Sequence, residues 1–420
     1  MKPLIKNTIS LLIIITFILG FVFREDLAGG GHLDIIPFFN NFLIIKNNSF
    51  FSIPWNDYIS SGFPLHHIIV GNVIFFSENI FLLKLFSFLI SFLCILVFYN
   101  ILNLKYKIKY SLNSSILLIS VIPLLSPFFR TTGFWGLEEN TCYLFFLISI
   151  YYFFNRKTDY YKYFSVFFAF LCILIRQTFV FLPLILFLYY FNFSKILNKK
   201  NLFIFFFFFI CSIPVFYFII IFGGPTKETN RIIYNPKNIP IIFSFFFIYL
   251  FPFIMIKLRE IIRYFIRIES LIHLPFFSIF YFFFSNQYEI HDWYNPLGGG
   301  LIYKSIFNLN FFTINLNLKI FLFLLISYLG LFFLLFVSKD NLLIKIFAFV
   351  TVAIYIFVNV IFQEYFDPLI FFIVILFTNY IQKKDLEKFS IIILFFYFFI
   401  FMLSFTYRYH IIPSAMNSLT

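Results

Sequence analysis

Long apolar segments constrain the fold of this chain more than any other feature. Its 420 residues are 62% hydrophobic and only 12% charged, and Phe alone occurs 77 times. A soluble fold of this length lacks the interior to hide so much apolar surface. A membrane-spanning helix needs about 20 apolar residues, because backbone amides in hydrocarbon must be satisfied within the helix. The sequence therefore predicts an all-α polytopic membrane protein.

The apolar segments predict a bundle of about 11–13 transmembrane helices. The first, over 8–23, has basic flanks but no clear small-x-small cleavage site, which favours a retained helix over a signal peptide. Residues 163–192 are alternatively one long helix. The whole chain, 1–420, is expected to form one integral membrane domain, with an outer loop over 24–79 and a helix bundle over 80–406. The predicted segments are 8–23, 80–102, 114–129, 141–155, 163–175, 178–192, 202–222, 240–256, 270–285, 316–337, 342–362, 367–382 and 389–406.

Charge is sorted between alternate loops, and this predicts the orientation. Short loops rich in Lys and Arg stay in the cytoplasm, so Lys2 and Lys6 place the N-terminus there. Most acidic residues then fall on the opposite side. Insertion and contact with membrane lipid explain the formal net charge of +13, and no nucleic-acid partner is expected. The cytoplasmic clusters are Lys105–Lys109, Arg156–Lys162, Lys195–Lys200, Lys257–Arg267, Lys339–Lys345 and Lys383–Lys388.

The first outer loop, over 24–79, is the longest polar stretch and holds three of the six histidines. Its apolar patches, Ile35–Phe39, Phe50–Trp55 and Phe63–Val70, predict helices that lie in the membrane interface. Such helices would hold the carboxylates of the loop at the depth of the lipid headgroups.

Asp34 is the candidate catalytic residue. The run Gly29–Gly31, followed by His32 and Asp34, joins a flexible turn to an acid at the start of an apolar helix. Glycine lets the backbone approach a ligand closely. Two interpretations of Asp34 stay open, a positioned catalytic carboxylate and a helix cap. Glu25 and Asp26 likewise either join the chemistry or mark the outer end of the first helix.

His66 and His67 follow a rigid turn at Gly62-Phe63-Pro64. Adjacent histidines point to different faces of a helix, so they make a poor metal pair by themselves. A structural role and hydrogen bonding to a substrate both remain open for them.

The second outer loop, over 130–140, places Trp135 beside Glu138 and Glu139. An exposed indole with acids nearby is a common way to hold a sugar ring. Alternatively, Arg130 only extends its charge to the interface and Trp135 only belongs to the interfacial aromatic belt.

Arg176-Gln177 lies between two apolar helices, where an arginine costs on the order of 3 kcal/mol and is retained for a charged partner. One candidate partner is a phosphate near the outer leaflet. The other is an internal carboxylate, namely Glu138, Glu139 or Glu364. Glu364 belongs to a late outer segment, and the loop over 286–296 adds further acids to the same side.

The layout of these motifs resembles the GT-C class of membrane glycosyltransferases, and within it the dolichyl-phosphate-glucose alpha-1,2-glucosyltransferase family. Arg176-Gln177-Thr178 matches an Arg-Gln-Thr of that family at a helix junction. The loop from His32 and Asp34 to Pro64-Leu65 is similar to its acidic first loop, and Glu364–Pro368 is similar to its late motif. The family has an adjacent Asp-Glu pair followed by a histidine where this chain has a histidine before a single Asp34, and the late motif here lacks the arginine.

The resemblance implies transfer of a hexose, glucose in alpha-1,2 linkage, from a polyprenyl- or dolichyl-phosphate sugar to a lipid-linked glycan in protein N-glycosylation. The reaction would occur at the non-cytoplasmic face, in the endoplasmic reticulum of a eukaryote or at the inner membrane of a bacterium. No cofactor is expected, although the clustered acids leave a divalent cation open. The implied roles are general base for Asp34, donor-phosphate binding for Arg176 and Gln177, and sugar or acceptor binding for His32, His66, Trp135, Glu138 and Glu364.

Two other classes of protein remain as alternatives. A transporter or flippase of a lipid-linked saccharide would bury charges in the middle of its spans. The predicted spans hold few ionisable residues, among them His273, Lys345 and Lys84, which favours surface chemistry over a transport path. A noncatalytic assembly subunit would tolerate loss of each outer acid in turn.

Overall fold

The computed structural model describes most of the chain, and all regular structure in the described residues is helical. Of His32 only the main chain is described. The described residues are 2–28, 31–48, 53–58, 60, 62–73, 79–108, 113–155, 158, 160–195, 198–224, 233–266, 273–285, 300–307, 315–339, 341–358 and 361–406.

The chain divides into two compact units, each described here by itself. Unit 1 covers 1–231 with 393–420, and unit 2 covers 232–392, so the last helix, α18 (Leu386–Thr406), contributes to both. The single domain expected over 1–420 stays a prediction. The other elements of unit 1 are α1 (Pro3–Val22), α2 (Gly31–Asn47), α3 (Leu65–Val73), α4 (Ile80–Lys105), α5 (Ser114–Val121), η3 (Ile122–Leu125), α6 (Pro127–Trp135), α7 (Glu139–Phe154), α8 (Tyr160–Ile173), η4 (Gln177–Val180), α9 (Phe181–Tyr190), η5 (Phe193–Lys195) and α10 (Lys199–Phe222). The other elements of unit 2 are α11 (Asn238–Ile256), α12 (Leu258–Ile266), α13 (His273–Ser285), α14 (Gly300–Phe307), α15 (Leu316–Ser338), α16 (Leu342–Tyr355), η9 (Gln363–Tyr365), α17 (Leu369–Phe377) and η10 (Lys383–Asp385).

Several helices have the length and apolar composition of membrane spans, as expected for an all-α multi-pass membrane protein. In the described part of the chain six qualify singly, namely α1, α4, α10, α11, α15 and the η10–α18 segment. A seventh is possible if the pair formed by Ser114–Leu125 and Pro127–Trp135, bent by 68°, is one broken span. Shorter apolar helices are α8, η4–α9, α13 and α16. The finer number of about 11–13 spans and the GT-C-like arrangement stay predictions.

The bend before α6 follows from the local sequence. Pro127 stands at the first position of α6, where a missing N–H costs nothing, and the Ser126 hydroxyl accepts a hydrogen bond from the Phe129 N–H (3.1 Å). The helix then ends at Gly136, whose φ of +77° favours glycine. The short α6, which follows the bend, carries Arg130 and Trp135 in unit 1.

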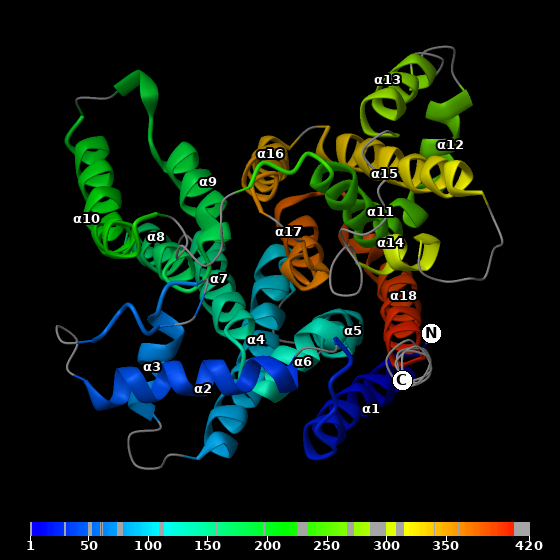
Figure 1. Ribbon diagram of the computed structural model, residues 1–420. Helices are drawn as coiled ribbons and strands as arrows, with labels where there is room; N and C mark the ends of the chain where they lie inside the picture. The colour runs from blue at the N-terminus through cyan, green and yellow to red at the C-terminus, as the bar shows by residue number, and fades with distance from the viewer. Residues whose placement is uncertain are drawn as a thin grey trace. The chain divides into compact units, whose positions relative to one another are not determined.

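The predicted interfacial helices are found in part. Within the first outer loop α2 contains the Ile35–Phe39 patch, α3 contains most of Phe63–Val70, and the two helices lie side by side (Figure 1). The patch at Phe50–Trp55 was predicted as a third helix, and this is wrong for its described part. Residues 53–58 form a turn, because the Asp57 N–H donates to the carbonyl of Pro54 (2.9 Å) and Pro54 has no N–H of its own.

The residues over 163–192 do not form one long helix, because α8 is separate from η4 and α9. The regular α-helix ends at Ile173, and Leu174, Ile175 and Arg176 separate α8 from η4. Arg176 has an extended backbone (φ −131°, ψ 110°), so the chain changes direction at the residue that carries the charge.

Unit 1 is held together by aromatic packing between helices. Phe17 and Phe21 of α1 stack on Phe88 of α4, with ring centroids 5.5 and 4.4 Å apart. Ile35, Phe42, Val70 and Leu83 form a buried cluster that joins α2, α3 and α4, with Trp135 of α6 packed against it.

Unit 2 is built around α11 and α15. Gly330 of α15 lies so close to α11 that a Cβ there would overlap the main chain of Phe243, the close approach that small residues permit between membrane helices. Phe247 and Phe333 stack across the same interface at 5.4 Å.

Candidate functional site

Arg176 forms a buried ionic cluster with Glu138 and Glu139. Its Nε lies 2.8 Å from Oε1 of Glu138, and its Nη2 donates to Oε1 of Glu139. The side chain of Arg176 is 16% exposed, whereas those of Glu138 and Glu139 are only 1% and 7% exposed. Of the two partners considered for Arg176, the structure therefore contains the internal carboxylate. A phosphate partner stays a prediction.

The start of α7 explains why two acids stand together there. Glu138 is the N-cap residue and Glu139 the first residue of α7. Negative side chains are favoured at a helix N-terminus, where backbone N–H groups point outward. Two buried carboxylates still require a cation, and Arg176 supplies it from the break after α8.

The first outer loop reaches the same place. The Leu65 N–H donates to the carbonyl of Leu174 (3.1 Å), which fixes the start of α3 to the break after α8. A Cβ on Gly62 would lie 2.5 Å from the carbonyl oxygen of Ile175 and 2.6 Å from Oε1 of Glu138. Only glycine leaves room for the turn to lie against Glu138.

Two histidines and a tyrosine complete this cluster, which we call the Arg176 cluster (Tyr58, His66, His67, Glu138, Glu139 and Arg176). His66 Nε2 lies 3.3 Å from the carbonyl oxygen of Gly136 and therefore carries the proton. The Tyr58 hydroxyl and His67 Nδ1 lie 2.8 Å apart. All three side chains are buried.

Burial keeps both imidazoles neutral near neutral pH. Loss of hydration lowers the pKa of His66 to about 4, with a smaller contribution in the same direction from the Arg176 charge, while its bond to Gly136 opposes the shift. Burial and neighbouring His66 likewise lower the pKa of His67. Burial and the Glu138 charge raise the pKa of Tyr58. The formal charges of the cluster are thus those of the two glutamates and Arg176.

Arg130 and Glu25 form a second buried ion pair. Nε and Nη2 of Arg130 donate to the two carboxylate oxygens of Glu25, at 2.5 and 2.7 Å, and the guanidinium also donates to the carbonyls of Leu124 and Thr16, both at 3.0 Å. Arg130 is 1% exposed, so the interpretation that it extends into the interface is wrong. Sequence reasoning missed this pair, and the only signal was an acid directly after the first helix.

Trp135 is held by the protein on its edge and on one face. Its Nε1–H donates to the carbonyl of Glu25 (2.8 Å), and Nζ of Lys84 lies 3.7 Å from the ring centroid. The indole edge and one of its faces therefore contact neighbouring groups. Stacking of a sugar on the other face stays a prediction.

Asp34 lies in the first turn of α2 and is exposed. The Gly31 N–H at the start of α2 donates to the Asp26 carboxylate (3.3 Å), so Asp26 supplies a capping contact. A Cβ on Gly31 would lie 2.6 Å from the Trp135 ring, which puts the start of α2 beside that indole. The side chain of His32 lies outside the described residues. Gln177 begins η4 next to Arg176 and is half-buried.

Glu364 lies in unit 2, in the 3-10 turn η9, and is described separately. Its charge acts on Lys304 of α14, whose pKa is lowered by burial and raised in part by Glu364. The adjacent Gln363 accepts from the Leu301 N–H (2.8 Å) and donates to the Tyr249 hydroxyl (2.6 Å). The acids predicted over 286–296 lie outside the described residues.

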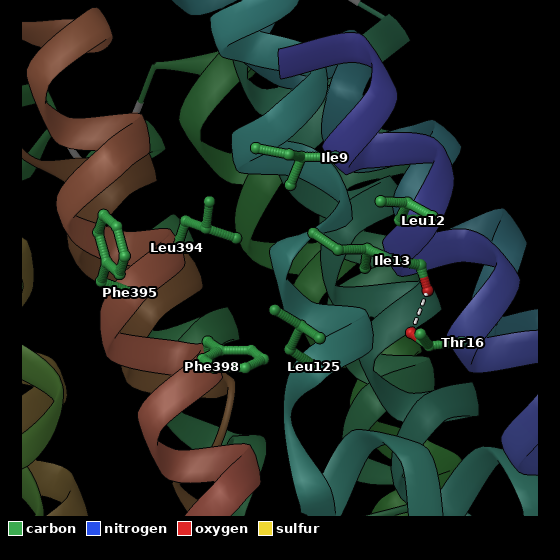
Figure 2. Close-up of a pocket in the computed structure, with 8 residues that line it drawn as sticks. All are labelled: Ile9, Leu12, Ile13, Thr16, Leu125, Leu394, Phe395 and Phe398. Carbon is green, nitrogen blue, oxygen red and sulfur yellow. Dashed lines mark hydrogen bonds between the residues drawn. The ribbon is translucent and has the colours of Figure 1, made fainter. Parts of the chain in front are cut away.

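An apolar groove of about 230 Å³ runs between α1 and α18 (Figure 2). Thr16 is its only polar lining side chain, and the Thr16 hydroxyl donates to the carbonyl of Ile13 (2.8 Å). The groove is smaller than the roughly 300–1,000 Å³ of a typical ligand pocket and lacks converging polar groups, so it does not suit a sugar. The lining residues are Ile9, Leu12, Ile13, Thr16, Leu125, Leu394, Phe395 and Phe398.

Within the described part of the chain, no three His, Cys, Asp or Glu side chains form a group that could hold a metal ion. Comparison of this chain with protein-family models, with curated proteins and with solved structures gave no match. The resemblance to a glycosyltransferase family therefore rests on sequence motifs alone.

Proposed function

We propose that this protein is a membrane glycosyltransferase that moves a hexose from a polyprenyl-phosphate sugar to a lipid-linked glycan. One observation carries the proposal. His66 from the first outer loop, Glu138 from the second and Arg176 from the helix junction lie in one cluster, although up to 110 residues separate them. Charge sorting predicts all three segments on the non-cytoplasmic side.

The proposed reaction is a displacement at the anomeric carbon. An acceptor hydroxyl attacks that carbon, the bond to the phosphate oxygen breaks, and lipid phosphate leaves with the electron pair. A carboxylate takes the hydroxyl proton. Asp34 is the proposed base, because it is exposed on α2, whereas Glu138 and Glu139 are buried against Arg176.

Arg176 and Gln177 are the proposed donor-phosphate ligands. A phosphate at Arg176 must compete with two carboxylates that already surround the guanidinium. Binding there is favourable only if a glutamate is protonated or moves aside, which predicts that donor binding is coupled to Glu138 and Glu139. The sugar and acceptor contacts are proposed for His32, His66, Trp135 and Glu138 of unit 1. The role implied for Glu364 of unit 2 stays a separate prediction.

The finer identity follows the family resemblance. It favours glucose, an alpha-1,2 linkage and dolichyl phosphate, in the endoplasmic reticulum of a eukaryotic cell. Turnover with different polyprenyl-phosphate hexoses distinguishes these details.

A transporter or flippase of lipid-linked saccharides is the second candidate. The observation that favours it is burial of charge, since Arg130 is 1% exposed and Glu138 is 1% exposed. Charged groups inside a helix bundle often line transport pathways. This burial weakens the sequence argument against a transport path, which relied on the small number of ionisable residues in the predicted spans.

Turnover with a panel of polyprenyl-phosphate hexoses and lipid-linked acceptors tests the main proposal. The purified chain in lipid nanodiscs is expected to release polyprenyl phosphate. Asp34→Asn should lower kcat by about 10²–10⁴-fold, the usual contribution of a general base. Asp57→Asn is the matched control, because Asp57 is an exposed acid of the same loop. An equal loss in both variants, or full activity in Asp34→Asn, would remove Asp34 from the mechanism.

A further inference from the structure

Two cationic side chains meet where α1 ends and α4 begins. Arg24 follows α1 by two residues, and Lys84 is the fifth residue of α4. Phe21 holds these helix ends together, because its ring lies 6.1 Å from Phe81 and 4.4 Å from Phe88. Arg24 and Lys84 are close enough to interact electrostatically.

Two acids of the described residues, Glu25 and Asp26, follow Arg24 in the chain. The Glu25 carboxylate accepts two hydrogen bonds from Arg130, so the charge of Glu25 cancels that of Arg130. Asp26 attracts Lys84, and Arg24 repels it. Among the described residues Lys84 has no carboxylate within ion-pair distance, and its ammonium lies over the Trp135 ring instead. Among these described residues, Arg24, Lys84 and Arg130 carry three positive charges and Glu25 and Asp26 two negative ones, a formal excess of one.

The backbone of Arg24 supports a role for its side chain. Arg24 has φ +56°, a left-handed conformation that is uncommon outside glycine, and its N–H donates to the carbonyl of Phe21 (3.2 Å). Glycine or asparagine would close the helix in this way at a lower cost. Arg24 is also exposed, so its guanidinium is accessible at the end of the helix.

We propose that Arg24 and Lys84, with the Trp135 ring beneath Lys84, bind the phosphate headgroup of a lipid. Both cations stand at the ends of span-length apolar helices, where headgroup phosphates are the abundant anions. The planar guanidinium of arginine can donate two parallel hydrogen bonds to phosphate oxygens, and the lysine ammonium adds a compact positive charge. The site is separate from the Arg176 cluster and does not depend on the proposed transfer reaction.

The hydrocarbon chain of the bound lipid has a place on the same helix. The apolar groove between α1 and α18 ends at Thr16, eight residues before Arg24, which is about 12 Å along the helix axis. Its volume of about 230 Å³ suits a segment of an acyl or prenyl chain better than a whole small molecule. A lipid with its phosphate at Arg24 can therefore extend into the groove of Figure 2.

Binding of dioleoyl phosphatidic acid to the full chain in detergent, followed by native mass spectrometry, tests the site. Dioleoylglycerol has the same chains without phosphate, and inorganic phosphate has no chains. The wild type is expected to retain phosphatidic acid and neither of the other two. Binding of inorganic phosphate with equal affinity would overturn the assignment to a lipid.

Variants separate this site from general charge attraction. Arg24→Gln and Lys84→Gln should each raise the Kd for phosphatidic acid about tenfold, the loss of one charge-assisted contact. Lys107→Gln is the matched control, because Lys107 is also exposed and left-handed (φ +51°) but follows the opposite end of α4. Arg24→Lys and Lys84→Arg keep the positive charge and control for misfolding, because they should retain more binding than the Gln variants. Unchanged binding in the Gln variants, or an equal loss in Lys107→Gln, would contradict the proposal.

Discussion

The Glu25–Arg130 pair gives the sharpest energetic prediction. Glu25→Gln removes the only carboxylate bonded to Arg130 among the described residues and leaves a guanidinium that is 1% exposed. Removing one partner of a buried ion pair costs about 3–5 kcal/mol, because the remaining charge stays desolvated. The carbonyls of Leu124 and Thr16 still accept from Arg130, so we expect the lower half of that range.

A double-mutant cycle identifies the origin of this loss. Arg130→Met together with Glu25→Gln removes both charges and is expected to cost less than either single change, with a coupling energy of about 2 kcal/mol or more. Unfolding in mixed detergent micelles, followed by circular dichroism, gives the four free energies. The control is Glu260→Gln, since Glu260 is 61% exposed in its contact with Lys257 and should contribute below about 0.5 kcal/mol. Additive losses at Glu25 and Arg130 would refute the buried pair.

Three further predictions concern stability. Lowering the pH from 6.5 to about 4 should destabilise the fold by on the order of 3 kcal/mol, because His66 is protonated in the unfolded chain and stays neutral in the folded one. His66→Gln should flatten the slope of unfolding free energy against pH over this range. Gly330→Val should cost about 1–3 kcal/mol in the same unfolding assay, because the side chain would overlap the main chain of Phe243, and a wild-type midpoint would contradict the close α11–α15 contact. Asn140→Leu should cost about 1–3 kcal/mol, because its amide donates to Ser91 (2.7 Å) and to the carbonyl of Phe129 (2.9 Å), and a neutral result would rule out this buried network.

The helices were predictable because their signal is local. An apolar run indicates burial in hydrocarbon or in the bundle, so each predicted segment overlaps a described helix. The bounds differ where the chain bends or stops early: 114–129 is broken before α6, and 342–362 extends past the end of α16 at Tyr355. The start of α2 was predictable from Gly31 and Asp34 for the same reason. The prediction of a third interfacial helix is wrong for its described part, because it relied on the apolar residues of Phe50–Trp55 and gave no weight to Pro54, which favours a turn.

The partners of the charges were less predictable, because ion pairs form between segments far apart in the chain. The cost of an arginine between two apolar helices indicated that Arg176 needs a partner, and Glu138 was one of several candidates. Nothing in the sequence indicated that Arg130 reaches Glu25 across 105 residues. Such contacts depend on how α1 and α6 pack, which periodicity does not report.

Simultaneous observation of polyprenyl-phosphate release and lipid crossing tests the central claim most directly. The wild-type chain in sealed proteoliposomes would receive a polyprenyl-phosphate hexose and a fluorescent lipid-linked glycan. A glycosyltransferase should release many polyprenyl phosphates per protein and lengthen the glycan, with the glycan remaining in its leaflet. Crossing of the glycan to the opposite leaflet with no polyprenyl phosphate released would contradict the account and identify a flippase.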